Sequence, residues 1–87
     1  MLPSPPNQEF IIEYVKDTKI TFYYLPTDED LLAKVRRFKL VNCSCPAYAR
    51  ERQRLTSEIS EAITLGLFDE IPQNIVKTNY PVLRILA

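Results

Sequence analysis

Two runs of β-branched and aromatic residues near the N-terminus constrain the fold most, because they predict strands ahead of any helix. They cover residues 10–16 (FIIEYVK) and 19–25 (KITFYYL). In the second run, Ile20, Phe22 and Tyr24 fall at every second position, which is the period of a strand with one buried face. A short turn at residues 17–18 separates the runs. The pattern predicts a β-hairpin.

Two helical patterns follow the hairpin. Pro26 ends the second strand, and Thr27 followed by three acids predicts the N-cap and first turn of a helix from Asp28 to about Leu40. Pro46 suits the first position of a second helix, which we expect to reach about Leu65. Its apolar stripe is predicted to comprise Tyr48, Leu55, Ile59, Ala62 and Ile63.

The remaining segments complete the predicted fold. Gly66 is a typical helix C-terminal stop, and Leu67, Phe68 and Ile71 are expected to fold back as a hydrophobic latch. Residues 80–87 read as a short strand that either joins the hairpin as a third strand or adds to another molecule's sheet. Strands followed by helices indicate an α+β fold, with both amphipathic helices packed on one sheet face. Residues 1–8 are expected to form a flexible tail, and residues 9–87 a single small domain.

Composition argues against most catalytic classes. The chain has no His and one Gly, so it lacks the usual general base, a Ser-His-Asp triad and a glycine-rich phosphate loop. We therefore expect a protein that is not an enzyme and uses no cofactor or small-molecule substrate. Two cysteines are too few for a disulfide framework, and no apolar run is long enough for a membrane span. These features predict a cytoplasmic protein without membrane contact.

The charge distribution is uneven although the net charge is zero. Residues 34–54 carry seven of the 11 cations and a single acid, Glu51, which gives this basic stretch a net charge of +6. Residues 1–33 carry −4 and residues 55–87 carry −2. A concentrated basic surface suggests an anionic partner, either nucleic acid or an acidic protein face. The candidate contact residues are Lys34, Arg36, Arg37, Lys39, Arg50, Arg52 and Arg54.

The C-terminal segment supplies a second candidate surface, because Val82, Leu83, Ile85 and Leu86 are a large apolar load for a terminal strand. We accordingly expect a small non-catalytic adaptor, inhibitor or regulator that contacts a protein partner or a second copy of itself. The alternative is a nucleic-acid-binding regulator that uses the basic stretch on phosphates. If the cations of the basic stretch form one exposed face, the nucleic-acid function is favoured. If they pair with neighbouring acids, it is disfavoured.

Three other groups of residues carry weaker signals. The aromatic faces of the second strand could stack bases, although core packing explains them more simply. Cys43 and Cys45 could supply half of a four-thiolate zinc site shared by two chains, or a reactive thiol, against the plainer interpretation of two small, partly buried thiols. Carboxylates that converge from separate elements, such as Glu13 with Asp28, would be needed for hydrolytic chemistry, and their spacing does not demand it.

A partial resemblance concerns the strand ending at Pro26, the acid-capped helix after it, and the segment at residues 56–63 (TSEISEAI). Together they resemble ribbon-helix-helix repressors, which are dimers that read DNA with paired strands. The longer linker, the shifted strand phase and the additional preceding strand depart from that family, and the chain is not assigned to it.

Overall fold

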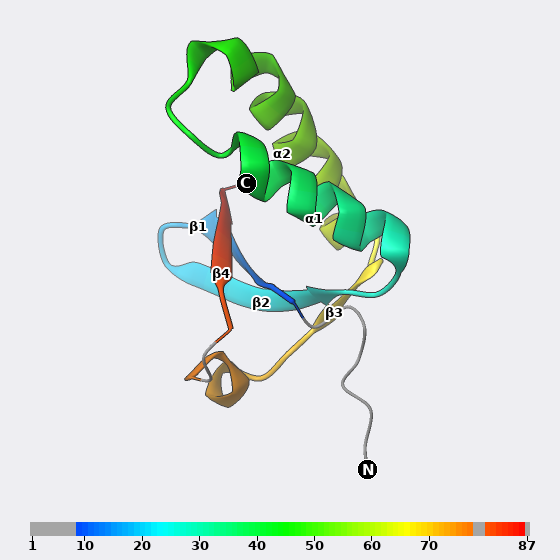
Figure 1. Cartoon of the computed structure of the whole chain (residues 1–87). Coiled ribbons are helices and arrows are strands. Elements are labelled where there is room, and N and C mark those ends of the chain that lie inside the picture. Colours follow the sequence, from blue (N-terminus) through cyan, green and yellow to red (C-terminus); the bar gives the residue numbers. More distant parts are fainter. Residues whose placement is uncertain (1–8, 78–79, 87) are drawn as a thin grey trace.

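The computed structural model describes residues 9–77 and 80–86, and the predicted tail at residues 1–8 lies outside them. The fold is α+β, as predicted: a hairpin, two helices packed on a four-stranded sheet, and a C-terminal strand (Figure 1). The elements in chain order are β1 (Ile11–Asp17), β2 (Ile20–Pro26), α1 (Glu29–Val41), the 3-10 turn η1 (Pro46–Tyr48), α2 (Ala49–Thr64), β3 (Phe68–Glu70), the 3-10 turn η2 (Gln73–Lys77) and β4 (Val82–Leu86).

The sheet has the strand order β3-β2-β1-β4. The predicted hairpin is confirmed, because β1 and β2 pair antiparallel with Tyr14 opposite Phe22. β4 joins as a strand of the same sheet and runs parallel to β1, with Ile11 opposite Val82. β3 pairs antiparallel with β2 and occupies the other edge. In the ribbon-helix-helix arrangement, a strand pairs with a second chain, whereas β2 here already has a neighbour on each side.

The start of α1 differs from the prediction by one residue. Asp28 is the N-cap, and its Oδ1 accepts a hydrogen bond of 2.9 Å from the backbone N–H of Leu31. The prediction that Thr27 caps this helix was wrong. The Thr27 hydroxyl donates instead to the carbonyl of Leu67, which ties the β2–α1 junction to the chain after α2. Aspartate and threonine are both favoured N-cap residues, and they are adjacent here, so the choice between them was open to a one-residue error.

The second helix begins later than expected. Residues Pro46–Tyr48 form a 3-10 turn, and the α-helix begins at Ala49. Tyr48, which we expected on the apolar stripe, lies in that turn with 41% of its surface exposed. The other four stripe residues, Leu55, Ile59, Ala62 and Ile63, are buried as predicted.

α2 ends at the predicted glycine. Gly66 has φ +76°, its N–H donates to the Ile63 carbonyl, and the N–H of Leu67 donates to the Ala62 carbonyl. These two bonds form a Schellman motif, which requires the left-handed conformation that glycine adopts most easily. Of the predicted latch, Phe68 is buried and belongs to β3, whereas Leu67 is exposed.

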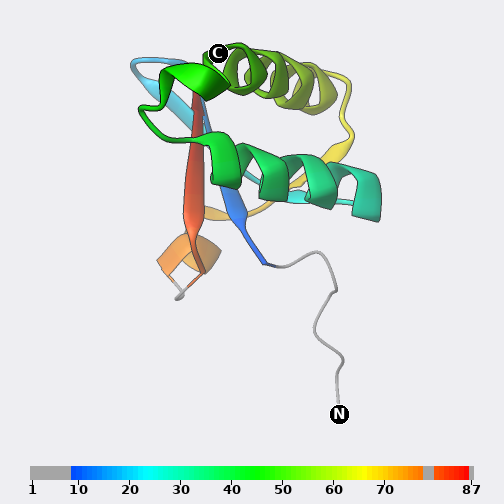
Figure 2. The same cartoon turned by 45° about the horizontal axis from the view of Figure 1, so that its top comes forward.

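The core lies between the helical layer and one face of the sheet (Figures 1 and 2). Ile12 and Ile85 contribute from the sheet, Leu32 and Val35 from α1, and Ile59 from α2, all with essentially no exposed surface. After β3, the chain through η2 runs along the face of the sheet opposite the helices (Figures 1 and 2). Ile11 points toward that side by strand alternation, and is fully buried outside the main core cluster.

Candidate functional site

The basic stretch forms ion pairs that connect different elements. Arg36 of α1 binds the Glu9 carboxylate through two donors, with its Nε 3.0 Å from Oε2. Arg37 binds Glu51 of α2, with Nη2 2.6 Å from Oε2. Lys34 lies 3.2 Å from Glu58, and Arg54 lies 3.7 Å from Glu51 and 3.8 Å from Glu58.

The other three cations of the stretch have different surroundings. The Lys39 ammonium lies 4.9 Å from the centre of the Phe10 ring. Arg52 donates to the carbonyls of Cys45 at 2.8 Å and Val41 at 3.4 Å, and no carboxylate of the described residues pairs with it. Arg50 is exposed at the start of α2 and has no partner among the residues that the structure describes.

These pairs bias the ionisation of their members. The hydrogen bond from Arg36 lowers the pKa of Glu9, and the hydrogen bond from Arg37 lowers the pKa of Glu51. Both pairs are solvent-exposed, so each contributes little to folding stability. They do matter for ligand binding, because a phosphate would have to compete with a carboxylate for Arg36, Arg37 and Arg54. The acids involved are Glu9, Glu51 and Glu58.

The C-terminal apolar residues divide by strand alternation. Leu83 and Ile85 point into the core and are buried, so their side chains are not available to a partner. Val82 and Leu86 point to the opposite face, with 42% and 61% of their surfaces exposed. Arg84 lies between them on the same face, and its Nε donates to the Glu13 carboxylate at 3.0 Å.

The backbone of β4 lies at one edge of the sheet. The N–H of Ile11 donates to the Pro81 carbonyl at 2.9 Å, which sets the phase of the parallel ladder. In this phase the N–H and C=O groups of Leu83 and Ile85 point toward β1, and those of Val82, Arg84 and Leu86 point outward. No other strand in the described part of the chain lies beyond β4.

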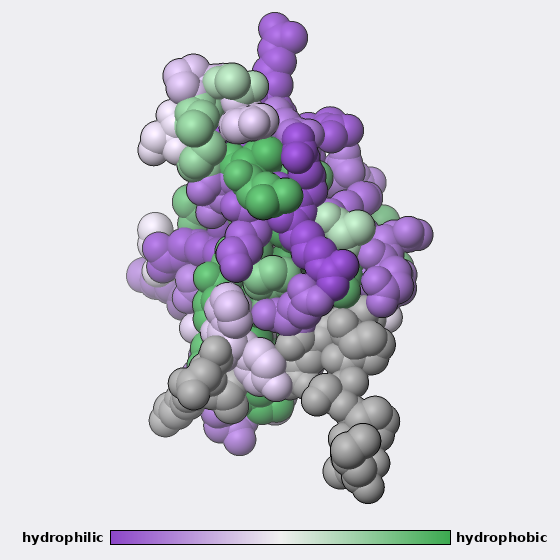
Figure 3. Space-filling model, in the orientation of Figure 1, coloured by the Kyte–Doolittle hydropathy of each residue, from purple (hydrophilic) through white to green (hydrophobic). Residues whose placement is uncertain are grey.

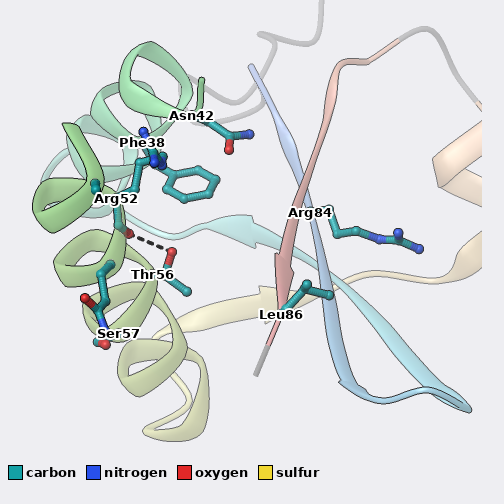
Figure 4. Close-up of a pocket in the computed structure, with 9 residues that line it drawn as sticks. Phe38, Asn42, Arg52, Thr56, Ser57, Arg84 and Leu86 are labelled. Carbon is teal, nitrogen blue, oxygen red and sulfur yellow. Dashed lines mark hydrogen bonds between the residues drawn. The ribbon is translucent and has the colours of Figure 1, made fainter. Parts of the chain in front are cut away.

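A groove of about 430 Å³ borders this free edge. It lies between β4 and the helical layer, and the side chains of Arg84 and Leu86 point away from α2 (Figure 4), so β4 presents its backbone to the groove. The hydroxyl of Thr56 on the opposite wall is engaged with the Arg52 carbonyl at 2.7 Å. The lining residues are Phe38, Asn42, Ala49, Arg52, Gln53, Thr56, Ser57, Arg84 and Leu86.

The charge that faces the groove comes from Arg52, because Arg84, the other charged residue that lines it, points away from α2 and pairs with Glu13. Sequence patterns did not identify this site, since it combines one face of α2 with the backbone of a strand far away in the chain. The available signal was Arg84 at the centre of an otherwise apolar strand. A charged residue there is typical of an exposed sheet edge.

The aromatic residues of β2 and the two candidate carboxylates have structural roles, whereas Cys43 and Cys45 are exposed and the prediction that they are partly buried was wrong. Phe22 and Tyr24 pack against the core, and Tyr23 on the opposite face donates to Glu13 at 3.4 Å. Glu13 is therefore engaged with Arg84 and Tyr23, whereas Asp28 caps α1, and the two carboxylates do not form a site. Within the described residues, no three side chains of His, Cys, Asp or Glu gather as metal ligands.

Most of the visible surface over the helices is hydrophilic (Figure 3). A hydrophobic patch interrupts it at the C-terminal end of α1, where Leu40 exposes 71% of its surface. Among the helices that the structure describes, none is both long enough and apolar enough to cross a membrane. Comparison of the chain with models of known protein families, with curated proteins and with solved structures found no match.

Proposed function

We propose that this chain is a small non-catalytic binding protein, an adaptor, inhibitor or regulator, which holds an extended acidic segment of a partner protein against β4. The observation that carries the proposal is the outer edge of β4, whose bonding groups face a groove and have no strand beside them in the described part of the chain. Two exposed free cysteines suit the reducing cytoplasm, where we place the protein.

Strand addition explains how such an edge would bind. The outward N–H and C=O groups of Val82, Arg84 and Leu86 can bond to every second residue of an added strand. Each such bond contributes about 0.5–1.5 kcal/mol net. Successive side chains of the added strand would face alternately toward α2 and toward the exposed side chains of Val82 and Leu86.

Charge favours an acidic partner over a second copy or a nucleic acid. Acidic side chains that face α2 would meet Arg52, which forms no ion pair with any residue that the structure describes. A second copy paired through β4 would instead bring the Arg52 side chains of the two copies toward each other. Nucleic acid receives less support, because Arg36, Arg37 and Arg54 already pair with carboxylates.

The test compares two substitutions at one position. A library of random linear peptides is selected on the immobilised protein, and the affinities of the selected peptides are measured by fluorescence anisotropy. Arg84→Ala and Arg84→Pro both remove the guanidinium group, but only proline removes the outward N–H. The ladder to β1 does not use that N–H, and proline is tolerated at such edges. We expect Arg84→Pro to bind roughly 10-fold more weakly than Arg84→Ala, since about 1.4 kcal/mol is tenfold.

The selected peptides should be rich in Asp and Glu, with alternating apolar residues. Circular dichroism shows whether both variants fold. If Arg84→Pro does not fold, the comparison is repeated with Val82→Pro and Val82→Ala. Equal binding by the alanine and proline variants would overturn strand addition. Concentration-dependent self-association that the proline variant abolishes would assign the edge to a second copy. Salt-sensitive binding of random DNA or RNA without peptide binding would favour the nucleic-acid function.

A further inference from the structure

A second cavity, of about 270 Å³, lies between the β1–β2 hairpin and the last turn of α2. The hairpin contributes alternate residues of both strands, on the face that carries the core, as strand geometry requires. The residues that line the cavity are Tyr14, Lys16, Phe22, Tyr24, Ile63 and Thr64. None of them lines the groove beside β4, so the two sites are separate.

Three of the lining side chains are aromatic. The centroids of the Tyr14 and Tyr24 rings are 6.2 Å apart with the ring planes at 71°, and those of Phe22 and Tyr24 are 6.4 Å apart. Phe22 and Tyr24 are only partly buried, so each ring packs on the core and still has exposed surface. Aromatic rings favour edge-to-face or offset-stacked contact with a further ring. This lining therefore suits a planar aromatic ligand.

The hydroxyl of Tyr14 is a polar group that the fold leaves without a partner at this cavity. Tyr14 exposes only 8% of its surface, and its hydroxyl forms no hydrogen bond with any residue that the structure describes. Unlike the hydroxyl of Ser60, it is not sealed from solvent, so the small exposed part of Tyr14 opens into the cavity. Tyrosine hydroxyls at buried positions usually have a hydrogen-bond partner, which a ligand with an acceptor would supply here.

The charge at the cavity is positive. Lys16 is exposed, forms no ion pair with any described residue, and is the single ionised residue of the lining. The negative end of the α2 dipole opposes it little, because the carbonyls of residues 60–63 all accept hydrogen bonds at the end of the helix. An ammonium group and a phenol both donate hydrogen bonds to a carboxylate, and the charged donor gives the stronger bond.

We propose that this cavity binds a small aromatic carboxylate, with its ring against the three aromatic side chains and its carboxylate bonded to the Lys16 ammonium and the Tyr14 hydroxyl. The size is suitable, since an apolar cavity of about 150 Å³ holds benzene. A cavity of about 270 Å³ has room for one ring with a short acidic side chain. Such a ligand would bridge the hairpin and α2, and would stabilise the folded chain as its concentration rises.

The test titrates the full chain with phenylpropionate and follows the amide chemical shifts by NMR. Two compounds of nearly the same shape are the ligand controls: phenylpropanamide lacks the charge, and cyclohexylpropionate lacks the aromatic ring. We expect phenylpropionate to bind more tightly than either. Lys16→Gln should weaken its binding roughly 10-fold, and Tyr14→Phe about 5-fold. Lys19→Gln is the matched control and should bind as the wild type does, because Lys19 is an exposed lysine of the same hairpin outside the cavity.

Circular dichroism shows whether the variants fold, and Lys16→Gln keeps the test decisive if Tyr14→Phe does not, because Lys16 is exposed. The proposal is overturned if phenylpropionate does not bind at millimolar concentrations, or if Lys16→Gln binds it as tightly as the wild type. Equal affinity for the amide would exclude an anionic ligand, and equal affinity for the cyclohexyl acid would exclude an aromatic one. Tighter binding of adenylate than of phenylpropionate would reassign the cavity to nucleotides.

Discussion

At the scale of single residues, the buried hydroxyl of Ser60 is the polar group in the least favourable environment among the described residues. Its hydroxyl oxygen is buried in α2 and has no hydrogen-bond partner among the described residues. The neighbouring hydroxyls of Thr56 and Thr64 donate to carbonyls one turn earlier, at 2.7 and 3.0 Å. Burial without a partner costs a hydroxyl about 1–3 kcal/mol. Ser60 therefore lowers the free energy of unfolding of a domain whose small size already limits its stability.

We predict that Ser60→Ala raises the free energy of unfolding by about 1–2 kcal/mol, because it removes the buried hydroxyl and improves helix propensity. The measurement is urea denaturation followed by circular dichroism. Ser57→Ala is the matched control on the exposed side of the same helix, and should gain only the propensity part of about 0.5 kcal/mol. Equal gains at both positions would show that the Ser60 hydroxyl is satisfied in solution.

At the scale of one element, the end of α2 depends on the backbone conformation of Gly66 more than on side-chain packing. A Cβ atom added to Gly66 would meet no atom within 4 Å. The requirement for glycine therefore comes from φ +76°, where other L-residues are strained. This φ value turns the chain from α2 into β3, where Phe68 enters the core.

We predict that Gly66→Ala lowers the free energy of unfolding by about 1–2 kcal/mol, without steric clash. Gly66→Asn should cost less, because asparagine adopts the left-handed region more readily than alanine does. Thermal or urea denaturation of the two variants provides the comparison. If both variants were as stable as wild type, the turn would not need a left-handed residue.

Local patterns predicted the elements that depend on local interactions. The strand period of β2, the apolar stripe of α2 and the glycine stop are each set by residues that lie a few positions apart in sequence. β3 was missed because three residues, Phe68–Glu70, cannot establish a period. They form a strand only because β2 offers its edge, with Tyr24 opposite Glu70. The α-helical start at Ala49 likewise could not be separated from the 3-10 turn at Pro46.

Exposed ion pairs link the layers of the whole molecule. Arg36 joins α1 to Glu9 before β1, and Arg37 joins α1 to Glu51 of α2. Both carboxyls have a folded-state pKa below the 4.5 of an unperturbed glutamate. Their contribution to stability is thus fully present above that unperturbed value, and is lost as the pH falls through the lower folded-state pKa.

We predict that the wild-type chain loses more stability than the Glu9→Gln/Glu51→Gln double variant as the pH falls from about 6 to about 3. The measurement is the urea midpoint as a function of pH at low salt, and added salt should shrink the difference. Glu61→Gln is the control, because the structure gives this exposed glutamate no ion pair within the described residues. Parallel pH profiles for the wild type and the double variant would contradict the prediction.

The candidate site was less predictable than the fold. The basic stretch and the apolar C-terminal segment were visible in sequence, but pairing of Arg37 with Glu51 depends on how α1 and α2 pack. Which C-terminal residues remain exposed depends on the phase of the β1–β4 ladder, set by Ile11 and Pro81. The groove exists only after both arrangements have formed. Long-range geometry of this kind has no local sequence pattern.

The parallel pairing of β1 with β4 has a consequence for biosynthesis. Glu13 and Arg84, which face each other across these strands, are 71 residues apart in sequence. At roughly 5–20 residues per second, a ribosome needs on the order of ten seconds to make that stretch. Meanwhile the hairpin can form, but the flank of β1 reserved for β4 stays open to foreign strands. Nascent chains on neighbouring ribosomes should consequently be the form of this protein most prone to aggregate.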